Sequence, residues 1–363
     1  MPSETLLYHP LMFASRKAWR KIIDRYGPAH PSTRLTRLII RAAMILETPA
    51  RLLETRRIES WMRRENPENE PIIIVGHWRS GTTHLHNCLH STGAFAILRH
   101  VDAIRPWAHN PLHGRFSRHL AASNRKIDRM PIHGEFPQED EIALAAMGTL
   151  SSFHFAYFPD HTDPIFRRTV LLDGVTDEEL DEWEHCLRFL FAKIRRHQVE
   201  PLPILLKNPG HTARIGVLYR RFPGSRFIHI VRHPYEVQAS TRRLVKNLIQ
   251  PLSLHGPSED RFSAGINRRY REMILAHLDQ RKLLPPDRYH ELRYEDLTLD
   301  PEAAVKAIFQ HLGMDFTAHH PDRLRRYLET IRSYQTHPHP EDGALRKLVE
   351  EECGFALDLW NYR

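Results

Sequence analysis

Residues 76 to 83, GHWRSGTT, combine residue types that suit the binding of an anion. Gly76 and Gly81 have the G-x-x-x-x-G spacing of a phosphate-binding loop, in which glycines let backbone N–H groups point toward an oxyanion. A helix that starts near Thr82 would add unpaired N–H donors and the positive end of its dipole. Thr82 stands where such a loop normally has a lysine for a nucleoside triphosphate, and the cation is Arg79 instead. Because a guanidinium can grip two oxygens at once, the loop predicts a terminal anionic group and not a magnesium triphosphate; an ordinary tight turn is the alternative.

A second cationic position follows another apolar run, RFIHIV at residues 226 to 231. Arg232 stands at the expected exit of this strand, Pro234 opens a helix, and Ser240 comes about two turns into that helix. Ligands of a parallel sheet collect beyond the carboxyl ends of its strands. We therefore expect Arg232 and the loop of residues 76 to 83 to project into the same region, as two anion sites.

The elements that must position these residues begin at Pro71. From there short apolar runs alternate with helical patterns, which is typical of βαβ units and a mainly parallel sheet. A helix is predicted at residues 82–92, directly after the loop. Strands are predicted at residues 72–75, 203–207, 226–231 and 289–294.

Two further helices have clear end signals. Thr176 and Glu179 form a capping-box pattern ahead of a long amphipathic stripe. Asp300 as N-cap, Pro301 at the first helical position and Gly313 as the stop delimit the second helix. The stripe of the first helix comprises Leu180, Trp183, Leu187, Leu190, Phe191 and Ile194.

Residues 1–68 are basic and carry apolar residues at helical spacing, until the polar segment at 65–71 breaks the pattern. We expect an N-terminal helical extension at 1–68 that packs on a main domain at 69–363. Trp19, Ile22 and Ile23 lie among basic residues, so peripheral contact of these helices with a membrane surface is the alternative.

Composition narrows the function classes. The net charge of +8 favours an anionic partner, but no recognised DNA- or RNA-binding signature is present, so we expect no nucleic acid partner. No apolar run is long enough to span a membrane, and the N-terminal segment lacks the apolar stretch of a secretory signal. Cys88, Cys186 and Cys353 match no metal spacing. A cytoplasmic setting is expected, with membrane association as an alternative.

The two anion sites together resemble those of the sulfotransferases that use 3′-phosphoadenosine 5′-phosphosulfate (PAPS), in their bacterial form. The RSGTT segment resembles the family's 5′-phosphosulfate loop, and Arg232 with Ser240 resembles its 3′-phosphate motif. LKNPGH at 206–211 is similar to the K-x-P-x-H segment of bacterial members, and RYEDL at 293–297 to their R-Y-E-D-L segment. The similarity runs from about residue 71 to residue 340. The loop residues concerned are Arg79, Ser80, Gly81, Thr82 and Thr83.

This resemblance implies an α/β, P-loop NTPase-like three-layer fold with a mainly parallel central sheet. It also implies PAPS as donor co-substrate, no required metal, and in-line transfer of a sulfuryl group to a hydroxyl or amine. The acceptor would be a small molecule, glycan or lipid, bound by variable segments at 95–170 and 245–285. Lys207 resembles the family lysine that reaches the bridging or leaving oxygen.

The acceptor must lose a proton, so a base is expected opposite the leaving group. FPQEDE at 136–141 resembles a P-Q-E-D-E run of bacterial sulfotransferases, which makes Glu139 the first candidate and Glu141 the next. The alternative is that these acids complement the dipole of a helix that begins at Pro137. Further candidates are His77 and His133 for the base, and His211, Tyr294 and His337 for the nucleotide pocket.

Two rival functions belong to other classes. A P-loop kinase or nucleotide hydrolase would need lysine at position 82 and an acid for magnesium. A basic anion-binding module without catalysis would bind nucleic acid or anionic membrane in a salt-sensitive way. Stabilisation by adenosine 3′,5′-bisphosphate, by magnesium ATP or by neither distinguishes the three.

Overall fold

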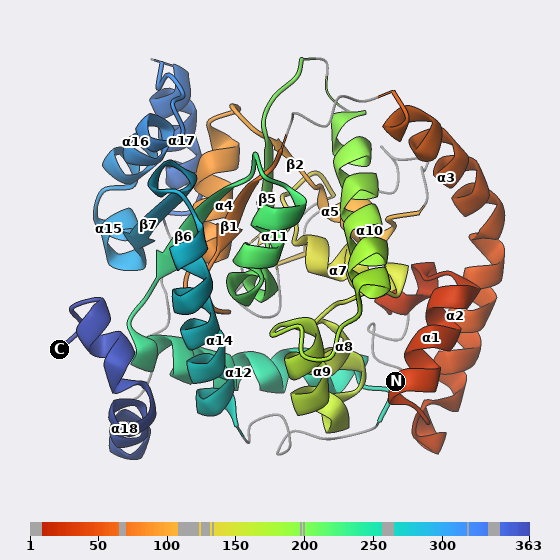
Figure 1. Cartoon of the computed structure of the whole chain (residues 1–363). Coiled ribbons are helices and arrows are strands. Elements are labelled where there is room, and N and C mark those ends of the chain that lie inside the picture. The colour runs from red at the N-terminus through yellow and green to blue at the C-terminus, as the bar shows by residue number, and fades with distance from the viewer. Residues whose placement is uncertain are drawn as a thin grey trace. The chain divides into compact units, whose positions relative to one another are not determined.

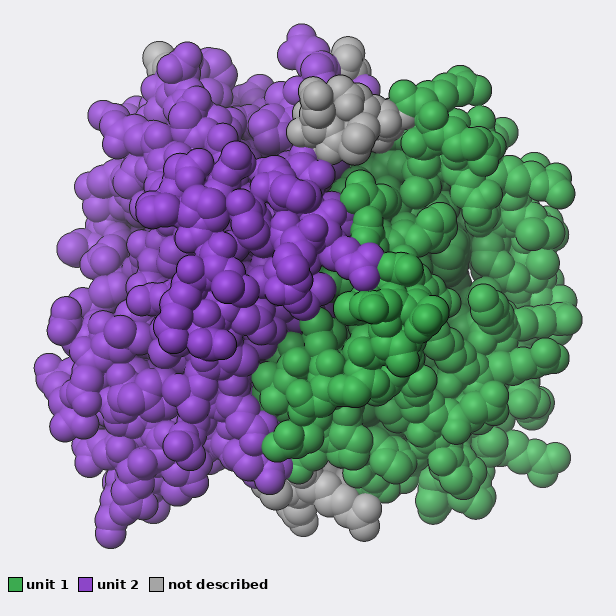
Figure 2. All heavy atoms as spheres, in the orientation of Figure 1, with its two compact units in different colours: residues 1–66, 98–197, 244–264 green, residues 67–97, 198–243, 265–363 purple. Residues whose placement is uncertain are grey.

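The computed structural model describes residues 9–64, 70–107, 123–124, 131–132, 134–196, 198, 200–255, 265–317, 319–332 and 342–363. By its internal contacts the chain divides into two compact units, which Figure 2 colours separately. Unit 1 comprises residues 1–66, 98–197 and 244–264, and unit 2 comprises residues 67–97, 198–243 and 265–363. The predicted boundary between an N-terminal extension at 1–68 and a main domain at 69–363 is a different division of the chain, and it stays a prediction.

Unit 2 contains a five-stranded sheet in which all neighbouring strands are parallel, in the order β2-β5-β1-β6-β7 (Figure 1). The four strands expected from the sequence are all present. Strand β2, with two residues at the sheet edge, was not expected, because so short a run leaves no pattern. The bounds are β1 Ile72–Val75, β2 Ala96–Ile97, β5 Ile204–Lys207, β6 Arg226–Val231 and β7 Tyr289–Arg293.

Helices cover both faces of this sheet. On one face Ile228 and Ile230 of β6 share a core cluster with α4 (Thr82–Ser91), α16 (Pro301–His311) and α17 (His319–Thr330). On the other face Val231 packs into a cluster with residues of α14 (Ile266–Gln280) and α18 (Gly343–Leu359). Alternate residues of one strand thus enter different cores, as the two-residue period of a strand requires. The predicted three-layer α/β fold with a parallel sheet is confirmed.

The helix end signals are confirmed as well. Helix α10 (Asp177–Arg195) begins with a complete capping box between Thr176 and Glu179. Helix α16 begins at Pro301, with the Asp300 carboxylate accepting the N–H of Ala303. The predicted stripe of α10 is buried at Trp183, Leu187, Leu190, Phe191 and Ile194, and half-buried at Leu180.

Unit 1 is mainly helical, and the N-terminal segment forms part of its core. Trp19 and Ile22 of α1 (Arg16–Tyr26) are only 5% and 2% exposed, and they share a core cluster with Tyr157 and Phe158. Trp19 and Ile22 are therefore not available for insertion into a membrane, because packing has already buried both side chains; membrane contact of the N-terminal helices as a whole stays a prediction.

The remaining elements have the following bounds. In unit 1 they are α2 Arg34–Leu46, α3 Thr48–Met62, α5 His100–Ile104, β3 Ser123–Asn124, β4 Pro131–Ile132, α7 Asp140–Met147, α8 His154–Tyr157 and α9 Thr162–Thr169. In unit 2 they are the 3-10 helix η5 Pro209–Ala213, α11 Ile215–Arg221 and α15 Tyr294–Leu299, and α12 Pro234–Leu252 continues from unit 2 into unit 1. No helix in the described ranges is both long enough and apolar enough to cross a bilayer.

Candidate functional site

The loop after β1 starts at a position that only glycine fits. Gly76 has a φ of +149°, and its N–H donates to the hydroxyl of Thr212 at 2.8 Å. A Cβ added to Gly76 would lie 2.4 Å from the backbone oxygen of Ile230, which cannot move without distorting β6. The loop therefore leaves the sheet along a fixed path.

The body of the loop has the geometry of an anion cradle. Arg79 has a φ of +73°, a left-handed conformation that residues other than glycine rarely adopt. Gly81, with a φ of +101°, leads into Thr82 at the first turn of α4, where backbone N–H groups lack an intrahelical partner. The Ser80 hydroxyl is buried and has no hydrogen-bond partner among the described residues. Backbone strain, free helix donors and an unsatisfied hydroxyl at one loop fit a bound oxyanion.

The two predicted anion sites meet through one hydrogen bond. Arg79 Nε donates to the hydroxyl of Ser240 at 2.8 Å, so the loop after β1 contacts α12, which follows β6. Strands β1 and β6 are neighbours in the sheet, and both elements extend from their carboxyl ends. The fold thus brings Arg79 and Ser240 together across 161 positions of sequence.

Tyr294 connects the same two segments from a third one. The guanidinium of Arg232 lies 4.5 Å from the centre of the Tyr294 ring. A Cβ added to Gly81 would lie 2.2 Å from Tyr294 Cδ2, so the ring packs directly on the loop. Burial raises the pKa of Tyr294, and the phenol stays protonated. Arg232 also pairs with Glu236 at 3.5 Å, which holds its side chain near α12.

Lys207 brings a second cation to the loop. It is the last residue of β5, it is 2% exposed, and its Nζ donates to the hydroxyl of Thr83 at 3.3 Å. The next residue, Asn208, donates its backbone N–H to the carbonyl of Ile74 at 3.1 Å, which ties this strand exit to β1. The amine is therefore held beside the first turn of α4.

His211 has a supporting position in the same segment. It is fully buried, its Nδ1 accepts from Arg214 at 3.1 Å, and its Nε2 lies 3.4 Å from the side-chain nitrogen of Asn208. These contacts brace the turn after β5.

The acidic candidates belong to unit 1 and differ from each other. Helix α7 begins at Asp140 with Glu139 as its N-cap, so the alternative interpretation was wrong about a start at Pro137, although Asp140 and Glu141 do lie in the first turn. Glu141 is 2% exposed, and its carboxylate accepts the backbone N–H of Ser152. Glu139 is half-buried. Glu141 is therefore buried inside its unit, whereas Glu139 is half-buried at the N-terminus of α7.

The remaining histidine candidates fall into two groups. His77 is buried against Tyr270, its Nδ1 donates to the carbonyl of Trp78 at 2.8 Å, and burial lowers its pKa to about 4. It is therefore neutral near pH 7. His133 and His337 lie outside the described residues.

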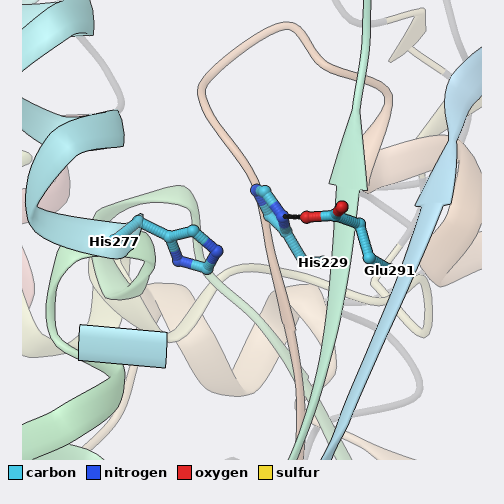
Figure 3. Close-up of side chains that lie close together, drawn as sticks. All are labelled: His229, His277 and Glu291. Carbon is cyan, nitrogen blue, oxygen red and sulfur yellow. Dashed lines mark hydrogen bonds and ion pairs between the residues drawn. The ribbon is translucent and has the colours of Figure 1, made fainter. Parts of the chain in front are cut away.

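A cluster that sequence reasoning missed lies on the opposite side of β6 from Ile228 and Ile230. His229, His277 and Glu291 place ligand-type atoms within 4.8 Å of one another, and Figure 3 shows His229 paired with Glu291 while the His277 ring faces them. The three residues come from β6, α14 and β7, so no local spacing announces them.

Hydrogen bonds hold most of this cluster together, although His229 Nε2 is buried without a partner among the described residues. Glu291 accepts from His229 Nδ1 at 2.8 Å, from the Tyr289 hydroxyl at 2.9 Å and from Trp360 Nε1 at 3.3 Å. These donors hold the carboxylate as an anion, and its pKa falls to about 2 despite the opposing effect of burial. His277 Nδ1 donates to the carbonyl of Thr212 at 2.9 Å, and the Thr212 hydroxyl accepts from Gly76. Through Thr212, the cluster therefore supports Gly76 at the start of the loop of residues 76–83.

Comparisons with known proteins agree with this geometry. Residues 71–318 match the model of a family described as the sulfotransferase family. Proteins of Mycobacterium bovis and Mycobacterium tuberculosis, both named omega-hydroxy-beta-dihydromenaquinone-9 sulfotransferase Stf3, are each 35% identical over 303 residues, which cover 80% of this chain and 75% of theirs.

Solved structures share the fold at low identity. The crystal structure of sulfotransferase STF9 from Mycobacterium avium is 19% identical with a TM-score of 0.70, over 95% of this chain and 92% of that one. For STF1 from Mycobacterium tuberculosis the identity is 18% and the TM-score 0.67, over 93% and 92% of the two chains.

Proposed function

The chain belongs to the sulfotransferase family, and from this premise we propose that it transfers a sulfuryl group from PAPS to a hydroxyl group of an apolar small molecule. The observation that carries the proposal is the hydrogen bond between Arg79 and Ser240. This bond joins the loop after β1, which is suited to one anionic group, to α12, which is suited to another. PAPS carries anionic groups at its 5′ and 3′ positions, so its binding needs two such sites close together.

On the donor, we assign the loop residues 79–83 and the first N–H groups of α4 to the 5′-phosphosulfate. Arg232 and Ser240 bind the 3′-phosphate, and Tyr294 keeps Arg232 in place through its ring. The buried, unpartnered hydroxyl of Ser80 supports this assignment, because a buried donor without a partner is costly unless a ligand satisfies it. We propose no metal in this step, since arginine, lysine and helix donors already supply positive charge.

In the transfer itself, the acceptor oxygen forms a bond to sulfur while the bond between sulfur and the bridging phosphate oxygen breaks. The electron pair of the broken bond stays on the 5′-phosphate of the departing adenosine 3′,5′-bisphosphate. Lys207 is placed at Thr83, next to the loop, and its charge stabilises the negative charge that develops on that leaving oxygen.

The acceptor proton goes to a carboxylate, for which we propose Glu139. It stands at the N-cap of α7 and is half-buried, whereas Glu141 is only 2% exposed. Glu141 is the second choice.

For the acceptor, we propose a hydroxyl at the end of a long apolar molecule. The support is the similarity to two proteins named for an omega-hydroxy menaquinone acceptor, at 35% identity over 80% of this chain. The acceptor segments predicted at 95–170 and 245–285 stay a prediction.

The test begins with binding of the donor product. Adenosine 3′,5′-bisphosphate is expected to raise the melting temperature, because a ligand that binds only the native state stabilises it, and magnesium ATP is expected to raise it less. Arg79→Ala and Arg232→Ala should each weaken bisphosphate binding about tenfold or more by calorimetry, since each removes a charged hydrogen-bond donor. Arg325→Ala is the control, because Arg325 is exposed and pairs with Glu302 on the surface.

The second part uses ³⁵S-labelled PAPS and a polyprenyl quinone with a terminal hydroxyl. Label should pass to this acceptor and not to the matching molecule without the hydroxyl. Bisphosphate affinity that is unchanged in both arginine variants would contradict the donor assignment, and label transfer to neither molecule would contradict the acceptor.

A further inference from the structure

Helices α2 (Arg34–Leu46) and α3 (Thr48–Met62) of unit 1 expose an unusual set of side chains. They form one curved helical run, because Glu47 between them keeps helical φ and ψ of −76° and −12° (Figure 1). Six large aliphatic side chains of this run are 53% to 80% exposed, out of ten exposed large hydrophobic side chains in the described part of the chain. We call them the aliphatic ridge: Leu35, Leu38, Ile45, Leu46, Leu52 and Leu53.

The exposed surface of α2 and α3 consists of apolar and basic residues. Between residues 34 and 57, every exposed position that is not in the aliphatic ridge is arginine, alanine or proline. No exposed position in that range is acidic or an uncharged polar residue. At about 100° per residue the ridge positions fall within about a third of the helix circumference, so they form a single stripe. The exposed residues outside the ridge are Arg34, Arg41, Ala42, Pro49, Arg56 and Arg57.

Two of the three acids of this helical run point away from this stripe, and the third, Glu59, is half-buried near the end of α3. Glu47 pairs with Arg105 at 2.6 Å, and Glu54, which is 1% exposed, pairs with Arg196 at 3.0 Å. Both acids are thus neutralised inside unit 1, next to buried Ile40 and Ile58 on the inner face. The outer face keeps a positive charge that no described acidic side chain balances by an ion pair.

We propose that the aliphatic ridge and its four arginines bind the surface of an anionic lipid bilayer. A helix that lies in the plane of a membrane needs an apolar stripe for the acyl boundary and cations at its margin for lipid phosphates. Here Arg34 precedes the stripe, Arg41 borders it, and Arg56 and Arg57 follow it, so their long side chains can reach the head groups while the leucines insert.

The charge of the four arginines favours an anionic membrane over a second copy of the chain as the partner of the aliphatic ridge. Two copies joined through the aliphatic ridge would bring unpaired arginines of one copy close to those of the other, which is repulsive. An anionic membrane satisfies both the apolar and the charged requirement. This inference concerns α2 and α3 alone and does not depend on the proposed donor, acceptor or transfer step.

Flotation with liposomes tests the proposal, using the full chain without donor or acceptor. Wild-type protein should float with vesicles of phosphatidylcholine and phosphatidylglycerol, and binding should fall in pure phosphatidylcholine or at high salt. The double variant Leu46→Gln/Leu53→Gln should lower the partition coefficient at least about tenfold, because two apolar side chains no longer insert. Arg56→Gln/Arg57→Gln should lower it about tenfold on anionic vesicles and leave binding to neutral ones unchanged.

The matched control is Leu299→Gln, because Leu299 of α15 is 86% exposed but lies outside the aliphatic ridge. Its vesicle binding should equal that of the wild type, and circular dichroism should show that all variants keep the native helix content. Wild-type protein that stays with the aqueous phase on anionic vesicles would overturn the proposal. So would vesicle binding that the leucine variants do not reduce, or a dimer in ultracentrifugation that these variants dissociate.

Discussion

The loop of residues 76–83 in unit 2 and the acidic start of α7 in unit 1 are both short polar segments, but different elements position them. In the loop, Gly76 is locked against Ile230, Arg79 is bound to Ser240, and Lys207 is bound to Thr83. At the start of α7, Glu139 has the N-cap backbone conformation but makes no side-chain capping hydrogen bond.

The difference follows from what each segment is attached to. The loop extends from the centre of a parallel sheet, where strand spacing and buried cores leave its backbone little freedom. The start of α7 extends from a helix of eight residues. We infer that donor binding depends on preorganised geometry, while the proposed base depends on the chemistry of one carboxylate. Substitutions in the two segments should therefore fail in different ways.

The largest effect is expected at Lys207. Lys207→Ala should lower the turnover number about a thousandfold, because a buried cation that acts on the leaving group is worth most in the transition state. Single-turnover transfer from ³⁵S-labelled PAPS measures it. Lys282→Ala is the control, since that lysine is 73% exposed and pairs with Asp279 one turn away. Turnover within a few-fold of the wild type would remove Lys207 from the transfer step.

The acidic segment is expected to show a smaller effect that separates its two glutamates. Glu139→Gln should reduce turnover about a hundredfold and leave bisphosphate affinity unchanged, since it removes a proton acceptor and no donor contact. Glu141→Gln should keep near-normal turnover, because the amide oxygen can still accept the N–H of Ser152. Steady-state kinetics with calorimetry on both variants gives the answer. The reverse order of turnover would make Glu141 the base.

The sequence predicted those features that local residue patterns specify, and it did not predict contacts between distant segments. The strands and the capped helices were predictable because short-range patterns specify them, and the loop residues because glycine, arginine and threonine stand at fixed spacing. The contact between Arg79 and Ser240 was expected only as a common region, since a spacing of 161 positions carries no geometry.

Other features had no sequence signal at all. The cluster of His229, His277 and Glu291 joins three elements that are far apart in the chain. The start of α7 was misplaced because Pro137 suits a first helical turn, yet Gln138 donates its N–H to Leu98 in an extended segment before the helix. Tertiary contacts decided both cases.

The geometry of the loop can be tested through stability. Gly76→Ala should lower the free energy of unfolding by about 2 kcal/mol or more, because the new methyl group meets the backbone oxygen of Ile230 at 2.4 Å. Gly313→Ala is the matched control, since Gly313 also has a positive φ, +66°, but nothing lies within 4 Å of an added Cβ. Urea denaturation measures both. If both substitutions cost the same, backbone conformation and not the close approach accounts for the glycine at position 76.

The smallest expected effect concerns the network behind the loop and its response to acid. The pKa of Glu291 is lowered from 4.5 to about 2, so its stabilising contribution is fully present above pH 4.5 and is lost as the pH falls toward 2. Glu291→Gln should therefore be less stable than the wild type at pH 7, by about 2 kcal/mol, and the difference should shrink through this acid window. Urea midpoints at a series of pH values provide the measurement.

Because the network reaches Gly76 through Thr212, the same variant should bind adenosine 3′,5′-bisphosphate a few-fold more weakly at pH 7. A stability difference that does not change with pH would show that Glu291 acts through packing alone, and unchanged bisphosphate affinity would uncouple the network from the loop.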